Sequence, residues 1–529
     1  MADQPRWLVA LVAALQEALP RLHGCQADPL VDELIGDLTE ALADGRLAIT
    51  VPSPAHRRAL LASPLLTDAA GPLVLADDQL QWRLWHQRRQ GVLTALQQRA
   101  LQQLPALAEP GAAQRDLALV AAHGAGLDPR QQDAVAAVLS RPLVLLEGGP
   151  GTGKTSTVSR MLAAVLEQQP GCRVQLAAPT GKAAARLRAS LDQASWPCTT
   201  LHRLLQSRGE GFARNRHHPL ALDLLVIDEV SMVDVPLMEA LLEALPPACR
   251  LVLVGDRAQL PPVGPGSVLQ DLQSPVLRTA LGPGAVELTR VYRNNGALAA
   301  VASALRGGAS DLEPLLSPLP PEGNLQWLQQ RSTRLPEVLL DRLRQHQQHL
   351  QTLAAGVDPA SPAKALQLLN QLERCLLLTP LRRGRWGVDA IHQALLGDGV
   401  LANPQLWPLG TPVLCPVNRD DLGLANGDLG VLVAHNGRRQ LVFAPAGSTE
   451  PLWVHPALLP GVQPALALTV HKAQGSEADE VWVLLPEGVR QARPLLYTAL
   501  TRARQRAWLI TADLPTLEPT ADHSVDLAR

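Results

Sequence analysis

One segment restricts the possible folds of this 529-residue chain more than any other. It matches the pattern G-x-x-x-x-G-K-[ST] in full, and it lies directly after an apolar run and before a helical pattern. Glycines let backbone N–H groups curl around a phosphate chain, and the start of a helix adds a partial positive charge. The segment therefore predicts a phosphate-binding loop, made of Gly148, Gly149, Pro150, Gly151, Thr152, Gly153, Lys154 and Thr155. Lys154 can reach the β- and γ-phosphates of ATP, and the Thr155 hydroxyl can hold Mg²⁺.

A pair of carboxylates supplies the partner that such a loop needs. The apolar segment Leu224–Ile227 is followed at once by Asp228 and Glu229. We expect Asp228 to bind Mg²⁺ and Glu229 to orient and deprotonate the attacking water. Together with the phosphate loop, the pair predicts nucleotide hydrolysis with ATP and Mg²⁺. ATPases, kinases and GTPases share both features, so the purpose of the hydrolysis stays open at this point.

Short apolar runs alternate with helical patterns in two parts of the chain. The first set is Leu143–Glu147, Val174–Ala177, Leu224–Ile227 and Leu251–Val254, and the second is Cys375–Leu378, Ala465–Val470, Val481–Leu485 and Ala507–Thr511. Repetition of strand and helix is typical of a parallel sheet covered by helices, so the expected fold class is α/β with two such domains. Between the two sets we expect a helical stretch over about 296–372.

The remaining segments differ in pattern. Residues 405–463 alternate apolar and polar residues around turn signals at 426–428 (Asn-Gly-Asp) and 435–437 (His-Asn-Gly), which predicts a small β-barrel inserted into the second α/β domain. Residues 1–115 are expected to be mostly helical, with helices over Leu8–Leu22 and Leu84–Leu107 and short strands at Leu47–Val51 and Leu73–Leu75. The predicted domains are thus 1–115, 116–285, 286–404 together with 464–529, and the inserted 405–463.

Composition excludes several classes of protein. The formal net charge of −2 rules out a strongly basic, histone-like binder but not an enzyme with one basic groove. The six cysteines are scattered and no two have C-x-x-C spacing, so a zinc site, an iron–sulfur cluster and a disulfide framework are not indicated, and we expect a reduced, cytoplasmic protein. The apolar run Trp7–Leu15 is short and is bordered by polar and charged residues, which argues against a signal peptide. It predicts an amphipathic helix instead.

Seven further stretches follow a fixed order along the chain. They are Leu127–Gln131, Ala178–Ala184, Thr199–His202, Gly255–Val263, Leu288–Arg293, Thr469–Glu477 and Tyr497–Arg504. Although the chain has only four lysines and two tyrosines, Lys154, Lys182, Lys472 and both tyrosines lie in the motifs. In their order and in their residues, these motifs resemble those of the superfamily 1 DNA helicases, and among them those of the RecD family. The resemblance covers residues 123–512 and implies two RecA-like P-loop NTPase domains, a helical N-terminal domain and an SH3-like β-barrel insertion.

The resemblance also implies roles for individual residues around ATP. Gln131 matches the glutamine that reads adenine, and its amide offers the donor and acceptor that the adenine edge requires. Tyr292 matches the residue that stacks on the base, and Glu477 the residue that contacts the ribose. Gln259 matches the sensor of the γ-phosphate. The arginines that reach the γ-phosphate from the second domain correspond to Arg293 and Arg502.

Five positions match residues near the path of a single DNA strand, where contacts to phosphate and sugar are expected. They are Thr180, Lys182, His202, Thr469 and His471. For the two histidines, packing of the motif loops is an equally good interpretation. His217 and His218 are adjacent, have no suitably spaced cysteine or carboxylate, and are expected in a loop or short hairpin rather than a metal site.

The resemblance implies an ATP-driven 5′→3′ translocase and helicase on single-stranded or duplex-end DNA. It would act as the alpha subunit of an exonuclease V complex with RecB-like and RecC-like subunits, the N-terminal domain docking on the RecC-like one. No lysine follows an acidic residue by two positions, so we expect no carboxylate–metal nuclease site in this chain. Two alternatives remain: a nucleotide-gated assembly subunit that does not translocate, and an RNA helicase of the same superfamily.

Overall fold

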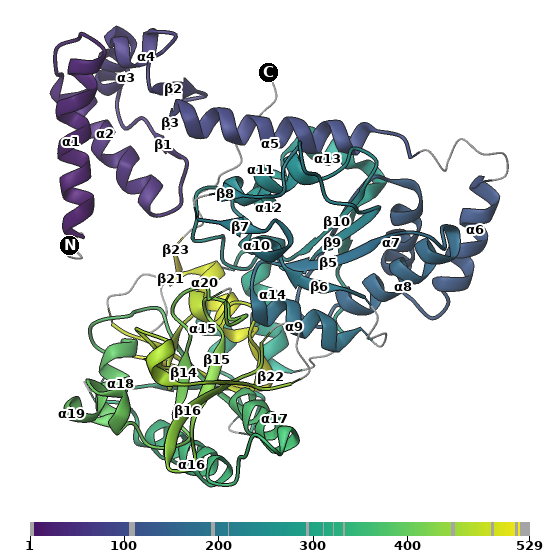
Figure 1. Cartoon of the computed structure of the whole chain (residues 1–529). Coiled ribbons are helices and arrows are strands. Elements are labelled where there is room, and N and C mark those ends of the chain that lie inside the picture. Colours follow the sequence, from purple (N-terminus) through teal and green to yellow (C-terminus); the bar gives the residue numbers. More distant parts are fainter. Residues whose placement is uncertain are drawn as a thin grey trace.

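The computed structural model contains two parallel sheets, each flanked by helices, with further elements at the N-terminus and within the second half (Figure 1). It describes residues 5–104, 112–191, 196–209, 211–292, 296–309, 311–320, 322–331, 334–419, 421–445, 450–487, 491–513 and 517–518. The sheets define two lobes, which we call the first lobe and the second lobe. In the described residues, no helix is both long enough and apolar enough to span a bilayer.

The first lobe is built on a six-stranded parallel sheet with the order β11-β4-β10-β9-β5-β6. Its strands are β4 (Leu143–Gly148), β5 (Val174–Ala178), β6 (Cys198–Thr200), β9 (Leu224–Ile227), β10 (Arg250–Gly255) and β11 (Ala285–Leu288). Alternate residues face opposite sides, as the period of a strand requires. Leu143 and Leu145 belong to one core, and Val144 and Leu146 to the other. All four strands expected in this part of the chain are therefore confirmed.

Helices cover both faces of this sheet. One core is completed by α5 (Arg83–Leu101), α11 (Val235–Ala244), α12 (Val268–Asp271) and α13 (Pro275–Leu281). The other is completed by α6 (Ala112–His123), α7 (Pro129–Ser140), α8 (Lys154–Gln168) and α9 (Gly181–Ser190). Between β6 and β9 lie the short helix α10 (Leu201–Leu204) and the strands β7 (Ser207–Arg208) and β8 (Gly211–Phe212). Both cores are leucine- and valine-rich, which explains why the strands read as nearly continuous apolar runs.

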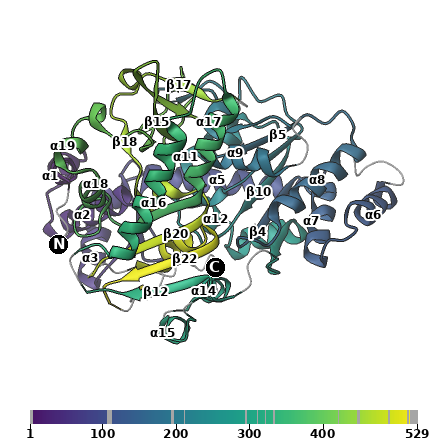
Figure 2. The same cartoon turned by 90° about the horizontal axis from the view of Figure 1, so that it is seen from below.

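The second lobe is built on a five-stranded parallel sheet with the order β12-β22-β20-β13-β19. Its strands are β12 (Leu325–Gln329), β13 (Cys375–Thr379), β19 (Leu468–Thr469), β20 (Ala478–Leu485) and β22 (Ala503–Thr511), of which β12, β22 and β20 lie side by side in Figure 2. Its helices are α14 (Ala297–Arg306), α15 (Glu313–Leu316), α16 (Glu337–Ala354), α17 (Pro362–Gln371), α18 (Val388–Leu396), α19 (Asp398–Leu401) and α20 (Arg493–Leu500).

Two expectations for the second lobe were wrong in detail. The stretch 296–372 is not helical throughout, because Leu325–Gln329 forms the edge strand β12 and pairs in parallel with Ala507–Thr511. Tertiary pairing decides a five-residue run whose local pattern is ambiguous. The strand expected over Ala465–Val470 is reduced to Leu468–Thr469, since the chain before it pairs with a different sheet.

An antiparallel five-stranded sheet is inserted between β13 and β19, with the order β17-β16-β15-β14-β18. Its strands are β14 (Pro412–Leu414), β15 (Leu429–His435), β16 (Arg438–Phe443), β17 (Leu452–Val454) and β18 (Gln463–Pro464). Asn436 and Gly437 form the two-residue turn between β15 and β16, both with positive φ, as expected. The Asn426-Gly427-Asp428 turn does not join two strands directly. It ends the long connection from β14 to β15 instead.

The N-terminal unit, residues 5–82, combines helices with a small antiparallel sheet of order β1-β3-β2. Its elements are α1 (Arg6–Leu22), α2 (Pro29–Ala43), β1 (Ala48–Thr50), α3 (Pro54–Ala62), α4 (Pro64–Thr67), β2 (Leu73–Ala76) and β3 (Gln79–Trp82). The expected helices and short strands are present, but the helix expected over Leu84–Leu107 ends at Leu101, since Gln102 is extended and residues 103 and 104 are not helical. Helix α5 then leaves this unit and runs along the first lobe, so the expected boundary at residue 115 lies beyond a helix that packs into the first-lobe core (Figure 1).

Candidate functional site: the seam between the two lobes

The phosphate loop connects β4 to α8 at the carboxyl edge of the first sheet. Gly151 and Gly153 have φ values of 73° and 83°, a region that favours glycine and lets the loop curl. The Lys154 ammonium lies across the loop and donates to the carbonyl oxygens of Gly148 at 2.6 Å and Gly149 at 3.1 Å. The Lys154 ammonium and the backbone N–H groups at the start of α8 are the donors that a triphosphate requires, and the two carbonyl oxygens hold the ammonium at the loop.

The two carboxylates lie at the neighbouring strand end. Asp228 follows β9, and one of its oxygens accepts a hydrogen bond from the Glu229 N–H at 2.9 Å. Burial, reinforced by the charge of Glu229, raises the pKa of Asp228 to about 6, while Lys154 and Arg186 act in the opposite direction. A buried carboxylate whose negative charge is only partly compensated is a suitable ligand for Mg²⁺. Asp228 therefore fits the metal-binding role that the sequence predicts, while the role of Thr155, the second residue of α8, stays a prediction.

The groups expected around the adenine gather beside the phosphate loop. Asp128 caps α7 and forms a capping box with Gln131, whose amide also donates to the Thr152 carbonyl at 3.4 Å. The Tyr292 hydroxyl donates to Asp128 at 2.7 Å, and the Tyr292 N–H donates to the Gly151 carbonyl at 2.8 Å. The ring of Tyr292 is half-exposed. A flat base can therefore approach a tyrosine ring that is fixed at both ends.

Gln259 lies in the loop that follows β10, residues 256–267, which we call the Gln259 loop. The side chain is buried, and its Oε1 has no hydrogen-bond partner among the described residues. A buried amide oxygen without a donor is costly unless a ligand or water completes it. The geometry therefore leaves Gln259 available for the sensing role predicted for it.

Direct contacts join the Gln259 loop to the second lobe. The Tyr497 hydroxyl donates to the fully buried Asp256 carboxylate at 2.5 Å, and the Leu260 N–H donates to Thr498 Oγ1 at 2.8 Å. Arg306 approaches Asp256 at 3.6 Å and pairs with Glu287 of β11 at 2.9 Å. Sequence reasoning assigned no role to Arg306, which lies outside every motif. The two lobes therefore meet at the motifs of the first lobe, and we call this interface the seam.

A small cavity of about 80 Å³ opens within the seam. Gly149 and Pro150 line it from the first lobe, and Arg306 and Tyr497 from the second. A Cβ placed on Gly149 would lie 3.1 Å from the Tyr497 hydroxyl. The second lobe thus lies directly against the phosphate loop, as a nucleotide site shared by two lobes requires.

Two of the three second-lobe residues expected at the nucleotide have protein partners in the structure. Arg502 is buried and donates to the carbonyl oxygens of Thr498 at 3.0 Å and Ser476 at 3.3 Å. Glu477 pairs with Arg186 of α9 at 2.8 Å and with Arg504 at 3.3 Å. Arg293 lies outside the described residues, so its predicted role stays a prediction.

Arg186 is a second residue that sequence reasoning missed. It belongs to α9, two residues after the motif Ala178–Ala184, and its charge is close enough to lower the pKa of Asp228. Through Glu477 it also connects that carboxylate to the second lobe. A single arginine at the edge of a motif carries no spacing signal, which explains why the sequence did not indicate it.

Four of the five positions predicted near DNA lie at the start of α9 or at the end of β19 and directly after it. Thr180 caps α9 by accepting from the Ala183 N–H at 3.2 Å, and a Cβ placed on Gly475 would lie 2.8 Å from its Oγ1. The Lys182 ammonium donates to Ser476 Oγ at 3.1 Å, and burial lowers the pKa of Lys182 to about 8. Thr469 is the last residue of β19, and His471 begins the short 3-10 helix that follows, where burial lowers the pKa of His471.

The two remaining histidine predictions concern residues of the first lobe. His202 contacts the Phe212 ring, with ring centroids 6.0 Å apart, which fits packing of the motif loop. His217 and His218 lie in a turn in which Asn215 accepts from both of their N–H groups. They are placed in a loop, as expected, and no metal-holding group of three or more His, Cys, Asp or Glu residues occurs in the part of the chain that the structure describes.

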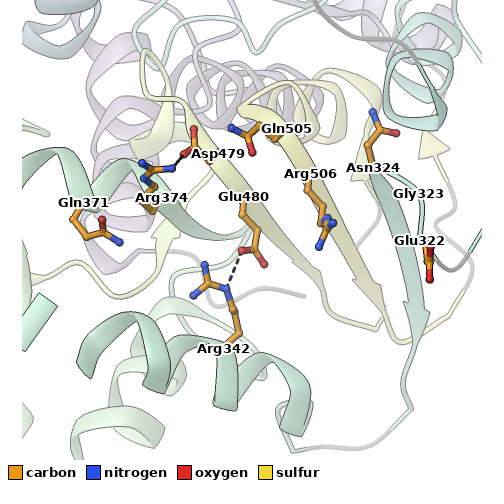
Figure 3. A pocket seen from close by; sticks show the side chains of 10 residues that line it. All are labelled: Glu322, Gly323, Asn324, Arg342, Gln371, Arg374, Asp479, Glu480, Gln505 and Arg506. Carbon is orange, nitrogen blue, oxygen red and sulfur yellow. Dashed lines mark hydrogen bonds and ion pairs between the residues drawn. The ribbon is translucent and has the colours of Figure 1, made fainter. Parts of the chain in front are cut away.

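A larger hollow, of about 630 Å³, lies away from the seam at the amino ends of β20 and β22 (Figure 3). Two of its arginines are already engaged: Arg342 pairs with Glu480 at 2.8 Å, and Arg374 with Asp479 at 2.8 Å. Arg506 and Glu322 also line the hollow, so three arginines face three carboxylates and no net charge favours an anion. Size alone therefore does not make this hollow the functional site.

Comparison with known proteins agrees with the motifs. An AAA domain model matches residues 131–265, and a UvrD-like helicase C-terminal domain model matches residues 464–510. The RecBCD enzyme subunit RecD of Mycolicibacterium smegmatis is 36% identical, over 97% of this chain and 91% of that protein. The chain belongs to the RecD family. The RecD subunit of Haemophilus influenzae is 31% identical, over 71% of this chain and 67% of that protein.

A RecD-family chain also has relatives outside the subunit itself. The ATP-dependent RecD2 DNA helicase of Deinococcus radiodurans is 34% identical, over 76% of this chain and 52% of that protein. A solved Pif1 helicase from Candida albicans is similar over 75% of this chain and 97% of that chain, at 18% identity and a TM-score of 0.41, a likeness too low to add to the fold described above. The two matching domain models cover the first-lobe motifs from Gln131 to Gln259 and the second-lobe motifs from Thr469 to Arg502.

Proposed function

We propose that this RecD-family chain is an ATP-dependent DNA helicase that translocates along single-stranded DNA, in the 5′→3′ direction. The observation that carries the proposal is the seam, where the phosphate loop and the Gln259 loop of one lobe lie against α14 and α20 of the other. A nucleotide bound at the seam would draw the two lobes together, and its hydrolysis would let them separate. This change in the separation of the lobes would move the DNA strand.

The residues divide the work on the triphosphate. Lys154 and the loop N–H groups would hold the phosphates, and Asp228 with Thr155 would hold Mg²⁺, which would supply positive charge to the phosphate oxygens. Glu229 orients and deprotonates the attacking water. From the second lobe, Arg293 and Arg502 stabilise the charge that develops on the γ-phosphate. For Arg502 this requires exchange of the Thr498 and Ser476 carbonyls for phosphate oxygens.

ATP hydrolysis would be coupled to movement of the DNA strand through residues that form contacts between the two lobes. Gln259 belongs to a loop whose Leu260 bonds to Thr498, so a shift at the γ-phosphate reaches the second lobe directly. Thr180, Lys182, Thr469 and His471 lie in the loops that change partners when the lobes separate. The contacts of Lys182 with Ser476 would then be replaced by contacts with phosphate and sugar, which carry no sequence information.

We also propose the assembly and the finer architecture. Relatives are named RecBCD enzyme subunit RecD, so this chain would join RecB-like and RecC-like subunits in the cytoplasm, with any nuclease in a partner. The domains would be RecA-like over 116–285 and over 286–404 with 464–529, and an SH3-like barrel over 405–463. The N-terminal domain, 1–115, would dock on the RecC-like subunit.

The proposed function is tested by measuring ATP hydrolysis by the full chain in the presence of single-stranded DNA or RNA. We expect a single-stranded DNA oligonucleotide to raise the rate of phosphate release, RNA of the same sequence to raise it less, and Lys154→Ala to remove it. Equal stimulation by RNA would indicate the RNA helicase instead. Turnover unchanged by either strand would indicate the assembly subunit that does not translocate.

A further inference from the structure

The Gln259 loop contacts a third part of the molecule besides the two lobes. At its far end, the Gly266 N–H donates to the carbonyl oxygen of Gly45 at 2.9 Å. Gly45 belongs to the turn between α2 and β1 of the N-terminal unit. The loop that carries the buried amide of Gln259 is thus held at one end by the second lobe and at the other by the N-terminal unit.

Close packing surrounds this hydrogen bond. Gly45 has a φ of +80°, and a Cβ placed on it would lie 3.1 Å from the Gly264 carbonyl oxygen and 3.3 Å from that of Val263. The neighbouring Leu47 packs against the first-lobe core, and a Cβ on Gly266 would lie 2.7 Å from its Cδ1. One additional carbon atom on Gly45 would therefore push the backbone of the Gln259 loop away by a few tenths of an ångström.

The segment between this contact and Gln259 is stiff. Pro261, Pro262 and Pro265 have φ fixed near −65°, so three of the six residues after Leu260 have lost one of their two soft torsions. The Pro265 carbonyl also accepts from the Val235 N–H of α11 at 3.1 Å. The segment therefore has few torsions in which a displacement at Gly264 to Gly266 could be absorbed before Leu260 and Gln259.

We propose that Gly45 and Leu47 of the N-terminal unit are positioning residues for the Gln259 loop. They hold it in the register in which Leu260 meets Thr498 and Gln259 faces the nucleotide. This inference rests on the proposed function, because it assigns the turn a part in coupling ATP turnover to the DNA strand. It also means that a protein partner bound to the N-terminal unit can change that coupling by moving the turn.

Two glycines of the N-terminal unit provide a matched test. Gly24 has a φ of +61°, and a Cβ placed on it would meet nothing within 4 Å. Gly24→Ala and Gly45→Ala therefore impose the same kind of backbone strain, but only Gly45→Ala pushes on the Gln259 loop. ATP turnover is measured on the full chain with and without a single-stranded DNA oligonucleotide, together with the KM for ATP and the thermal unfolding midpoint.

We expect Gly45→Ala to lower the stimulation of kcat by DNA about threefold or more, with little change in the KM for ATP, and Gly24→Ala to match the unaltered chain. Leu47→Ala, which removes the packing without backbone strain, is expected to act as Gly45→Ala does and serves in its place if that variant does not fold. Stimulation in Gly45→Ala and Leu47→Ala equal to that in Gly24→Ala would overturn the inference. Absence of stimulation in the unaltered chain would instead contradict the proposed function.

Discussion

At the scale of single residues, Glu229 combines a strained backbone with a buried carboxylate. Its φ is 53°, a left-handed conformation that a residue with a side chain adopts at a cost of about 1 kcal/mol or more. Such strain persists where the surrounding structure requires one orientation of the side chain. Here the strained residue directly follows Asp228, and its charge is close enough to raise the pKa of that carboxyl.

Glu229→Gln tests this role. We expect ATP turnover to fall by about 10²–10⁴-fold, because the amide cannot accept a proton from water, while ATP binding is retained. Phosphate release and equilibrium binding of a fluorescent ATP analogue measure the two quantities. Glu239→Gln is the control, since Glu239 lies on the surface of α11 beside Arg88. Turnover in Glu229→Gln within about twofold of the control would refute the assignment.

A second prediction at this scale concerns acid stability. His392 is buried, accepts from the Ala467 N–H at 3.2 Å, and has its pKa lowered to about 4 by that burial. As pH falls, the unfolded chain takes up the proton first, near pH 6.5, so this stability is complete above 6.5 and is lost between 6.5 and 4. His392→Gln should therefore lose less stability over that window, by at most about 1.4 kcal/mol per pH unit.

Urea unfolding at pH 7.5, 6 and 5 measures the effect. His217→Gln, on an exposed turn, is the control and should follow the unaltered chain. His346 is also buried with a pKa lowered to about 4, so His392→Gln reduces the acid sensitivity without removing it. Parallel loss of stability in both variants would show that His392 does not contribute.

At the scale of elements, α5 links the N-terminal unit to the first lobe, and two arginines hold it there by hydrogen bonds and an ion pair in addition to apolar packing. Arg99 is buried and donates to the carbonyl oxygens of Pro246 at 3.2 Å and Pro247 at 3.4 Å, and also to that of Cys249. Nearer the start of the helix, Arg89 forms a forked pair with Asp271, with contacts of 2.6 to 3.1 Å. These bonds fix the helix on the segment after α11 and on α12.

Arg99→Ala should therefore destabilise the first lobe by roughly 2–4 kcal/mol, because it leaves buried carbonyls without donors and opens a cavity. The free energy of unfolding in denaturant measures the loss. Arg88→Ala, on the exposed face of the same helix, is expected to change it by less than about 0.5 kcal/mol. Equal effects of the two substitutions would show that α5 is held by its leucines alone.

Elements also show what the sequence could predict. Strands β4, β5, β9 and β10 of the first lobe were predictable because each is a buried apolar run that ends in a motif, as β9 does before Asp228. The two edge strands of the same sheet, β6 and β11, were not predicted, since they are short and only partly apolar. Strand β12 was not, since Leu325–Gln329 contains two glutamines and becomes a strand only through its pairing with β22. Motif order likewise indicated Gln131 and Tyr292, whereas Arg186 and Arg306 act through contacts between lobes that no local pattern records.

At the scale of the whole molecule, three parts meet around one loop. The Gln259 loop bonds to α20 of the second lobe through Leu260 and to the N-terminal unit through Gly266. The first lobe holds the phosphate loop and the carboxylates, and the second closes over them at the seam. Only their assembly brings α14 and α20 of the second lobe against the phosphate loop. The central claim is therefore that the nucleotide is shared between lobes.

Arg502→Ala tests that claim most directly, with ATP turnover and ATP binding measured on the same full-length sample in the presence of single-stranded DNA. The account predicts that turnover falls about 10³-fold while ATP affinity stays within a few fold, because an arginine from the second lobe acts mainly on the transition state. Arg374→Ala, at a surface pair of the same lobe, should leave both unchanged. If Arg502→Ala turns over ATP as fast as Arg374→Ala does, the second lobe takes no part in hydrolysis and the account is wrong.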